Sequence, residues 1–465
     1  MFSKETYAGR RAELRKLMAG DGGIVLLPGN GESPVNYPDN CYHFRQDSTF
    51  LYFFGISLPG LVAVIDLDSE SDILLGNDLS MDDIIWTGPQ PSISDLASKS
   101  GAASLPLAEL EAIVGKARRQ GRKVHYLPPY RGEAAIFLAS LLGIEIGAVA
   151  GEASVPMALS VVALRSIKSP EELAQIEDAC SIGYKMHTTA MKMCHPGTTE
   201  GQIAGTIEGI ALQYGAGVSF ASIVSQNGET LHNHSHHQTL TEGRLLLVDA
   251  GAENTMNYCS DFTRTIPVGG KFSQKQKEIY QIVLDANNLG ARLSAPGKLY
   301  RDIHLAAVRS IAEGLKSLGL MKGDMDEAVA HGAHALFMPH GLGHMMGLDV
   351  HDMENIGEKY VGYDKETERS KQLGLSSLRM GRRLQPGMVM TVEPGIYFIP
   401  AYIAKWKTEG TCAEFINFAA LEPYMNFGGI RIEDNIVITP SGCRLPGTRL
   451  PATIDEVESV VKQIG

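Results

Sequence analysis

The sequence has few cysteines, no excess of positive charge and no long apolar segment, and each absence excludes a class of protein. Its six cysteines are scattered without a CxxC pair, which indicates reduced thiols and a cytoplasmic protein. With 41 basic against 53 acidic residues, the formal charge of −12 offers no basic surface to nucleic acid or an anionic membrane. Residues 1–18 mix charged and apolar side chains, so we expect neither a signal peptide nor a membrane-spanning helix.

Motifs of several catalytic classes are also missing. The sequence has no P-loop, no GxSxG elbow and no HExxH pattern. Cys194 adjoins His195, but adjacency in sequence does not pair a nucleophile with a base. Covalent catalysis therefore has little support.

The length of 465 residues favours two domains, since one core rarely serves so long a chain. Short apolar runs between turns in 23–75, with helical periodicity nearby at 6–19 and 132–142, predict an α/β domain. A helix-start signal follows at Ser169 and Pro170. We therefore place one domain at residues 1–160 and a second at 161–465.

The second domain is expected to be α+β, because its strand-like runs gather late in the chain. Helical patterns cover residues 170–194, 199–214, 273–294 and 300–318. Strand-like runs cover residues 244–250, 262–268, 387–398 and 429–438. Two polar stretches, 354–383 and 400–427, are interpreted as surface insertions or lids.

Four of these segments hold a carboxylate where a buried strand would normally hold an apolar residue. Asp249 ends a run of four aliphatic residues and Asp261 follows twelve residues later, so a short hairpin would bring them side by side. Glu393 and Glu433 repeat the pattern near the C-terminus. Converging buried carboxylates repel one another unless protons or cations neutralise them, which favours a multivalent metal ion.

A glycine-rich loop at 339–352 adds His340, His344 and His351, and its glycines permit turns that aim several imidazoles at one cavity. Four carboxylates and an imidazole suit a pair of Mn²⁺-like ions, which can activate a water and polarise a carbonyl for hydrolysis. The alternative is that each acid is an arginine partner, a turn former or a solvent-facing residue.

Four more histidines stand close together at His232, His234, His236 and His237. They are interpreted either as a solvated loop or as an accessory metal site.

These motifs resemble the pita-bread metallopeptidases, the superfamily of prolidase, aminopeptidase P and methionine aminopeptidase. The resemblance covers about residues 165–440 and follows the family's order of motifs. Residues 42–55 resemble the creatinase-like domain of the proline-specific members. The resemblance implies an α/β N-terminal creatinase-like domain followed by an α+β pita-bread catalytic domain.

The resemblance also implies a dinuclear metal centre, expected to hold two Mn²⁺ ions. Its ligands would be Asp249, Asp261, His344, Glu393 and Glu433. Asp261 and Glu433 would bridge the ions, and Glu393 would carry the proton from the attacking water to the leaving nitrogen. Relatives usually separate the two aspartates by eleven residues, so the twelve found here imply an extra residue in the hairpin turn or a bulge.

Further site residues follow from the same resemblance. His340 and His351 would hold the scissile carbonyl and the tetrahedral intermediate, with His232 as another active-site histidine. Tyr397 and Arg431 would brace the ligand carboxylates beside the substrate.

Two predicted substrate contacts have plain alternatives. Arg379 resembles an arginine of prolidases from higher organisms that reaches the free carboxylate of a dipeptide, or it is an ordinary surface arginine. Trp86 resembles a tryptophan that lines a neighbouring subunit's active site, which would imply a homodimer or homotetramer, or it is a core aromatic.

We therefore predict a peptidase of the Xaa-Pro bond that prefers dipeptides, with proline-containing peptides rather than nucleic acid or membrane as partners. The first alternative is an aminopeptidase P acting on longer peptides. A metal-free creatinase-like amidinohydrolase and a non-catalytic pita-bread binding module are others, and the intact ligand set counts against both.

Overall fold

The computed structural model describes residues 1–462, which form two compact units. Unit 1 comprises residues 1–165 and 353–360, and unit 2 comprises residues 166–352 and the chain from residue 361 onward. Residues 353–360 thus group with unit 1, although the sequence placed them in the second domain. Which core a short segment joins depends on tertiary packing, which local pattern does not report.

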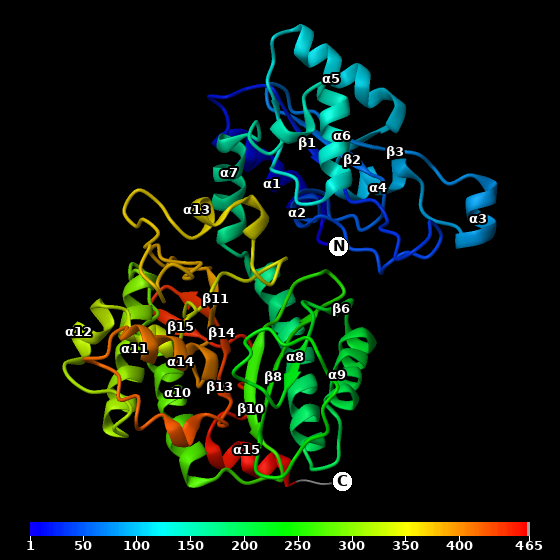
Figure 1. The fold of residues 1–465 in the computed structure, drawn as a ribbon. Helices are drawn as coiled ribbons and strands as arrows, with labels where there is room; N and C mark the ends of the chain where they lie inside the picture. Colours follow the sequence, from blue (N-terminus) through cyan, green and yellow to red (C-terminus); the bar gives the residue numbers. More distant parts are fainter. Residues whose placement is uncertain (463–465) are drawn as a thin grey trace. The chain divides into compact units, whose positions relative to one another are not determined.

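Unit 1 is built on a five-stranded mixed sheet with strand order β4-β3-β2-β1-β5 (Figure 1). Strands β1, β2 and β3 pair antiparallel, whereas β4 and β5 pair in parallel with β3 and β1. The strands are β1 (Ile24–Pro28), β2 (Val62–Asp66), β3 (Asp72–Gly76), β4 (Ala103–Pro106) and β5 (Val124–His125). The helices are α1 (Lys4–Leu17), α2 (Ser48–Phe54), α3 (Met81–Thr87), α4 (Ile93–Ser100), α5 (Leu110–Arg119), α6 (Gly132–Leu142) and α7 (Val155–Ser166), whose last residue belongs to unit 2.

Alternate residues of the central strands face one helical layer, as the period of two in a strand requires. Ile24 and Leu26 of β1 and Val64 of β2 share a core cluster with residues of α5 and α6. Elsewhere in unit 1, the fully buried Arg11 of α1 donates to the Asp72 carboxylate at 2.7 Å and to the Phe53 carbonyl at 2.7 Å. Unit 1 is therefore the predicted α/β domain.

Four long helices dominate unit 2, and they match the predicted ranges to within one residue at each end. They are α8 (Pro170–Met193), α9 (Glu200–Tyr214), α10 (Gln274–Leu293) and α11 (Tyr300–Ser317). At the start of α8, Ser169 accepts from the Glu172 backbone N–H and Glu172 accepts from that of Ser169, so the predicted helix start is confirmed. Shorter helices are α12 (Met325–Ala330), α13 (Glu358–Val361), which crosses the unit boundary, α14 (Pro400–Glu409) and α15 (Ile454–Val461).

The strands of unit 2 lie between α8 and α9 on one side and α10 and α11 on the other (Figure 1). Three-stranded sheets run β10-β8-β7 and β11-β14-β15, and β12-β13 and β6-β9 form two-stranded pairs. The strands before the histidine loop are β6 (Gly217–Val218), β7 (Ile223–Ser225), β8 (Leu245–Ala250), β9 (Ala252–Glu253) and β10 (Phe262–Pro267). Those after it are β11 (Val389–Val392), β12 (Gly395–Tyr397), β13 (Gly429–Arg431), β14 (Asp434–Thr439) and β15 (Gly442–Arg444).

The predicted hairpin between the two aspartates is present. Its register is unchanged from the Ala250–Phe262 pair to the Glu253–Cys259 pair, so no bulge interrupts it. In the turn that follows, Asn257 adopts φ +64°.

Two predicted strands, 387–398 and 429–438, are each divided in two. The pairs Val392–Asp434 and Gly395–Arg431 keep one register, which places Glu393 opposite Glu433 in the gap between them. Pro394 lies in this gap and has no N–H to donate to a ladder. The prediction of uninterrupted strands was wrong at the two glutamates.

The insertion at 400–427 is more than a surface lid, because α14 buries Ile403 and Trp406. Across residues 1–462, no helix has the length and apolar character needed to cross a membrane.

Candidate active site

The β8–β10 hairpin presents both aspartates on one face. Thr263 stands opposite Asp249, so Asp261, two residues before Thr263, is the diagonal neighbour of Asp249 on that face. Arg431 of β13 donates from Nη2 to Asp249 Oδ2 at 2.6 Å. The other carboxylate oxygen of Asp249 and Oδ1 of Asp261 are buried without a hydrogen-bond partner.

The two glutamates reach the same place from the gap in the second ladder. Glu433 is buried, and its Oε2 accepts from the Thr263 hydroxyl at 2.8 Å. A bridge between Thr263 and Glu433 joins β10 to this ladder. The register at the strand breaks and the bridge to β10 therefore place Glu393 and Glu433 close to Asp249 and Asp261.

His344 faces these acids with one ring nitrogen. Its Nδ1 lies 3.0 Å from the Met345 carbonyl, an acceptor, so Nδ1 carries the proton and Nε2 presents a lone pair. That Nε2 lies 3.3 Å from Asp261 Oδ2 and 3.8 Å from Glu393 Oε1. A histidine fixed in this tautomer is ready to ligate a metal.

The basic side chains around the cluster do not fully neutralise the negative charge of its four carboxylates, as the pKa shifts of three of them indicate. Burial, followed by the nearby Asp249 carboxylate, raises the pKa of Asp261 well above its usual value. Burial and Asp261 do the same to the pKa of Glu433, and burial raises the pKa of Glu393 to about 7.

A divalent cation fits this donor set. Ligand atoms of Asp261, His344 and Glu433 lie within 4.8 Å of one another, the only such group of three or more in residues 1–462. Carboxylate oxygens with one imidazole suit a hard divalent ion, and the orphaned buried oxygens of Asp249 and Asp261 call for a cation.

The cluster opens into a cavity of about 450 Å³. The predicted site residues that line it are His232, Asp249, Asp261, His340, His344, His351, Arg379, Glu393, Arg431 and Glu433. Phe220, Ile223, Leu231 and Val350 add an apolar wall. The cavity can thus hold a small substrate with an apolar part beside the acids.

Tyr397 lies beneath the cavity in a chain of hydrogen bonds. Arg431 donates from Nη1 to Tyr397 Oη at 2.7 Å, and Oη lies 2.8 Å from His340 Nε2. His340 Nδ1 lies 2.8 Å from the Gly341 carbonyl, so Nδ1 donates and Nε2 accepts the tyrosine proton. Burial and then Arg431 lower the pKa of His340 to about 3, which keeps the ring neutral.

The other predicted histidines also reach the cavity. The His351 ring lies edge-on to the His344 ring, with centroids 4.2 Å apart. Burial and then Arg431 lower the pKa of His232. His236 contacts the Ser222 carbonyl through Nε2 at 3.1 Å. Among the described residues, none of the four clustered histidines belongs to a group of side chains spaced to hold a metal ion.

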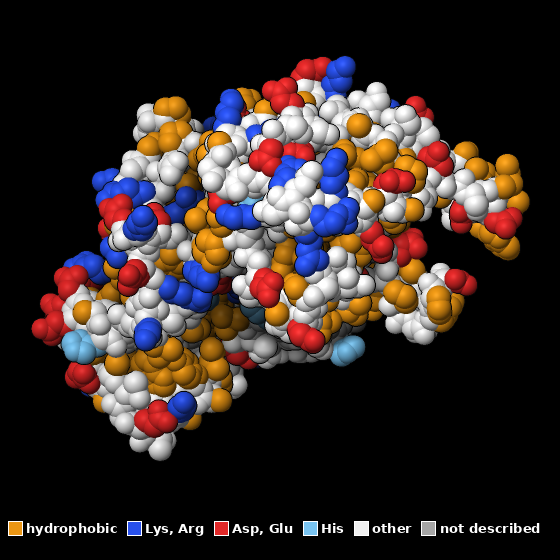
Figure 2. Space-filling model, turned by 90° about the horizontal axis from the view of Figure 1, so that it is seen from above, with side chains coloured by type: hydrophobic (Ala, Val, Ile, Leu, Met, Phe, Trp, Pro, Cys, Tyr) orange, Lys and Arg blue, Asp and Glu red, His pale blue; other side chains and the backbone are white. Residues whose placement is uncertain are grey.

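Trp86 lies outside the cavity lining. It belongs to α3 of unit 1 and is 86% exposed, so the core-aromatic alternative is wrong. Met81 and Ile85 of the same helix are exposed as well, and hydrophobic side chains gather over α3 at the right-hand edge of Figure 2.

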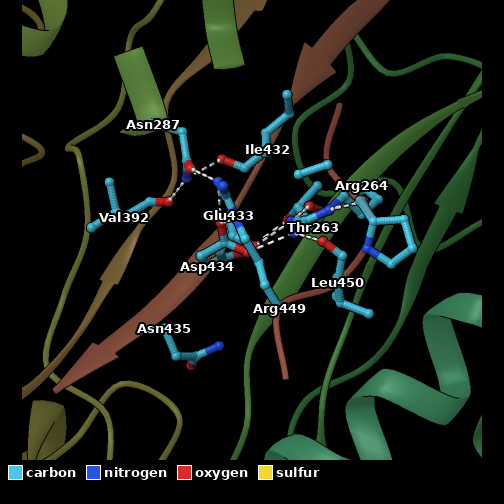
Figure 3. Close-up of polar contacts among 12 residues, drawn as sticks. Thr263, Arg264, Asn287, Val392, Ile432, Glu433, Asp434, Asn435, Arg449 and Leu450 are labelled. Atoms are coloured by element: carbon cyan, nitrogen blue, oxygen red, sulfur yellow. Dashed lines mark hydrogen bonds and ion pairs between the residues drawn. The ribbon is translucent and has the colours of Figure 1, made fainter. Parts of the chain in front are cut away.

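Sequence reasoning missed several residues that hold the site. Thr263 binds Glu433, and Asn435 donates to the backbone carbonyl of Asp261. Asn287 of α10 donates to the carbonyls of Val392 and Ile432, the residues that precede the two glutamates (Figure 3). For Thr263 a signal existed, because it shares a strand face with Asp261 two residues earlier.

Profiles of two known domains match the chain. The first, "Metallopeptidase family M24", matches residues 174–440. The second, "Aminopeptidase P, N-terminal domain", matches residues 7–125. The second profile falls within unit 1, and the first lies in unit 2 except for residues 353–360.

The matches to individual relatives extend over nearly the whole chain. A human Xaa-Pro dipeptidase is 32% identical over 94% of this chain and 88% of its own length. A probable Xaa-Pro aminopeptidase of Fusarium vanettenii is 32% identical over 99% of this chain and 97% of its own. Zinc-substituted E. coli aminopeptidase P with product superposes with a TM-score of 0.80 at 30% identity, covering 100% and 99% of the two chains.

Proposed function

Because this chain belongs to metallopeptidase family M24 and carries an aminopeptidase P N-terminal domain, we propose that it hydrolyses the bond between an N-terminal residue and a following proline. Relatives named Xaa-Pro dipeptidase and Xaa-Pro aminopeptidase support this bond as the target. The observation that carries the proposal is the convergence of four acids and His344 on one cavity, with buried carboxylate oxygens that lack a partner.

The metal is proposed to be a pair of Mn²⁺ ions, because the donor set is rich in oxygen. Asp249, Asp261, His344, Glu393 and Glu433 would hold the pair, with Asp261 and Glu433 shared between the ions. When bound, the ions would polarise the scissile carbonyl and lower the pKa of the attacking water.

The surrounding residues divide the remaining work. Glu393 would take the proton of the attacking water and pass it to the proline nitrogen. His351 and His340 would hold the carbonyl oxygen and the negative charge that develops on it, beside His232. Substrate binding at His340 requires the Tyr397 hydroxyl to exchange partners, since it occupies Nε2. Arg431 fixes both Asp249 and Tyr397.

Metal analysis tests this function directly. Protein purified without chelator is expected to contain about two divalent transition ions per chain and to hydrolyse Ala-Pro but not Ala-Ala. Plasma mass spectrometry and a proline-release assay measure both properties. A protein without metal that leaves Ala-Pro intact would instead be a creatinase-like enzyme or a binding module.

Dipeptides are proposed as the preferred substrates because Arg379 lines the cavity. Proline lacks an amide hydrogen and restricts the residue before it, so a dedicated pocket is required. A dipeptide also places a free carboxylate beside that pocket, and a planar guanidinium can bind it with two hydrogen bonds. Longer peptides would have to extend past the insertion that carries Arg379.

Replacing Arg379 by alanine is expected to lower kcat/KM for Ala-Pro by about tenfold or more, which is the range for hydrogen bonds to charged groups. Ala-Pro-Ala should be little affected. Arg383→Ala is the control, because Arg383 lies in the same insertion but pairs with Glu366. If the parent prefers the tripeptide and Arg379→Ala loses nothing on dipeptides, the enzyme is an aminopeptidase P.

The cellular setting is also proposed. All six cysteines are free in the structure, which suits a cytoplasmic protein. The exposed Trp86 suits contact with a second copy of the chain in a homodimer or homotetramer.

A further inference from the structure

The amide of Asn287 joins the two chain segments that carry the glutamates. Asn287 lies on α10 and is 1% exposed. Its Nδ2 donates to the Val392 carbonyl at 2.8 Å and to the Ile432 carbonyl at 3.3 Å. Val392 precedes Glu393 and Ile432 precedes Glu433, so one side chain contacts both segments directly before the acids (Figure 3).

This amide supplies a donor that the ladder lacks. The register places Pro394 opposite Ile432, and the Ile432 N–H donates to the Pro394 carbonyl at 3.3 Å. In an antiparallel pair the reciprocal bond would run from residue 394 to the Ile432 carbonyl, but proline has no N–H. Asn287 Nδ2 makes that bond instead.

The missing hydrogen bond between residue 394 and Ile432 lies next to the pair of opposed glutamates. Glu393 and Glu433 face each other across the same gap, and like charges directly opposite on a sheet repel. The ladder thus lacks a backbone hydrogen bond next to the position where the two glutamate side chains repel each other. Asn287 holds the two strands together at this point.

The orientation of the amide is fixed from the other side. Arg449 donates from Nη2 to Asn287 Oδ1 at 3.0 Å, which leaves the NH₂ group for the two carbonyls. Arg449 also donates from Nε to Asp434 Oδ2 at 3.0 Å. Arg264 donates to Asp434 Oδ1 at 2.6 Å and to the Glu433 carbonyl at 2.7 Å, so the whole network lies against the backbone of Glu433 (Figure 3).

We propose that Asn287 is a positioning residue that sets the separation of Glu393 and Glu433, two of the acids that would hold the metal. This inference rests on the proposed metal centre. Asn287 is not among the residues that line the cavity, so it would act through the two strands that carry the acids. Partners of this kind around ligands typically change metal affinity by about 10- to 100-fold.

The test is Asn287→Asp, which keeps the size of the side chain but replaces the donating NH₂ by an acceptor. Titration of the metal-free protein with Mn²⁺ should show the weaker of two dissociation constants raised about tenfold or more. The electron paramagnetic resonance spectrum of the Mn²⁺ pair should show altered coupling. At saturating metal, kcat should fall about tenfold with KM nearly unchanged.

A matched control is Asn30→Asp in unit 1. Asn30 is 6% exposed and donates from Nδ2 to the Arg45 carbonyl at 2.8 Å and to Tyr130 Oη at 3.0 Å, so the variant also loses a buried amide donor to a backbone carbonyl. Asn30→Asp should lower Tm without changing either Mn²⁺ constant or the spectrum. A merely structural role for Asn287 would give the same result as this control.

Asn287→Ala is the second variant, should the aspartate prevent folding, since alanine suits the middle of α10. Parental Mn²⁺ affinities and spectrum in a folded Asn287 variant would overturn the inference and leave the proposed function standing. A parent protein that binds no divalent metal would overturn both.

Discussion

Replacing Glu433 by alanine is expected to lower hydrolysis of Ala-Pro by at least about a thousandfold, the scale seen when one member of a catalytic unit is removed. Glu433 receives the Thr263 hydroxyl and faces Glu393 across the ladder gap, so it stands at the centre of the proposed ligand set. Bound metal should fall from about two ions per chain to one or fewer.

Stability separates this loss from unfolding. Removing a buried carboxylate relieves its repulsion with Asp261, so Tm of the metal-free variant should not fall below that of the metal-free parent. Added Mn²⁺ should raise Tm of the parent and have much less effect on the variant. Plasma mass spectrometry and thermal unfolding measure these quantities.

Glu458→Ala is the control for a lost buried carboxylate. Glu458 of α15 accepts from Lys271 at 2.6 Å and from the Phe272 N–H at 3.2 Å, away from the cavity. Its loss should lower Tm while metal content and kcat remain parental. Near-normal activity of Glu433→Ala would contradict the ligand assignment.

Replacing His351 by alanine is expected to lower kcat by about a hundredfold or more while both ions stay bound. His351 lines the cavity and its ring packs edge-on against His344, the proposed metal ligand, so it could reach a substrate oxygen beside the metal. KM should change little, because the charge that His351 stabilises develops mainly in the transition state.

His331→Ala serves as the control. His331 is an exposed histidine whose Nδ1 contacts the Glu327 carbonyl at the end of α12, so its loss should leave kcat unchanged. Steady-state kinetics with metal analysis on the same samples decide the outcome. Loss of metal from His351→Ala would make His351 a ligand instead.

The fold and the acids could be predicted because their signals are local. Aspartates at the ends of apolar runs and helix caps such as Ser169 are visible in a few neighbouring residues. The strand breaks at Glu393 and Glu433 escaped prediction because the apolar pattern continues across them. Pro394 was the available signal, since it cannot complete a ladder.

The network behind the glutamates could not be predicted from sequence. Asn287 lies 162 residues before Arg449, and their contact arises only when α10 and the C-terminal segment meet the ladder. A single asparagine within an amphipathic helix is also compatible with a solvent-facing position.

The packing of residues 353–360 in unit 1 affects the order in which the two units can fold during synthesis. Met353 and Ile356 are buried, and Asn355 lines a small pocket together with Leu26 and Pro28 of β1. During synthesis, the N-terminal unit cannot finish folding until residue 360 has left the ribosome, by which time most of the catalytic chain has emerged. A gene cut after residue 165 would therefore yield two incomplete products and not two domains. In the C-terminal product, Met353 would lose the packing that buries it, two residues from His351.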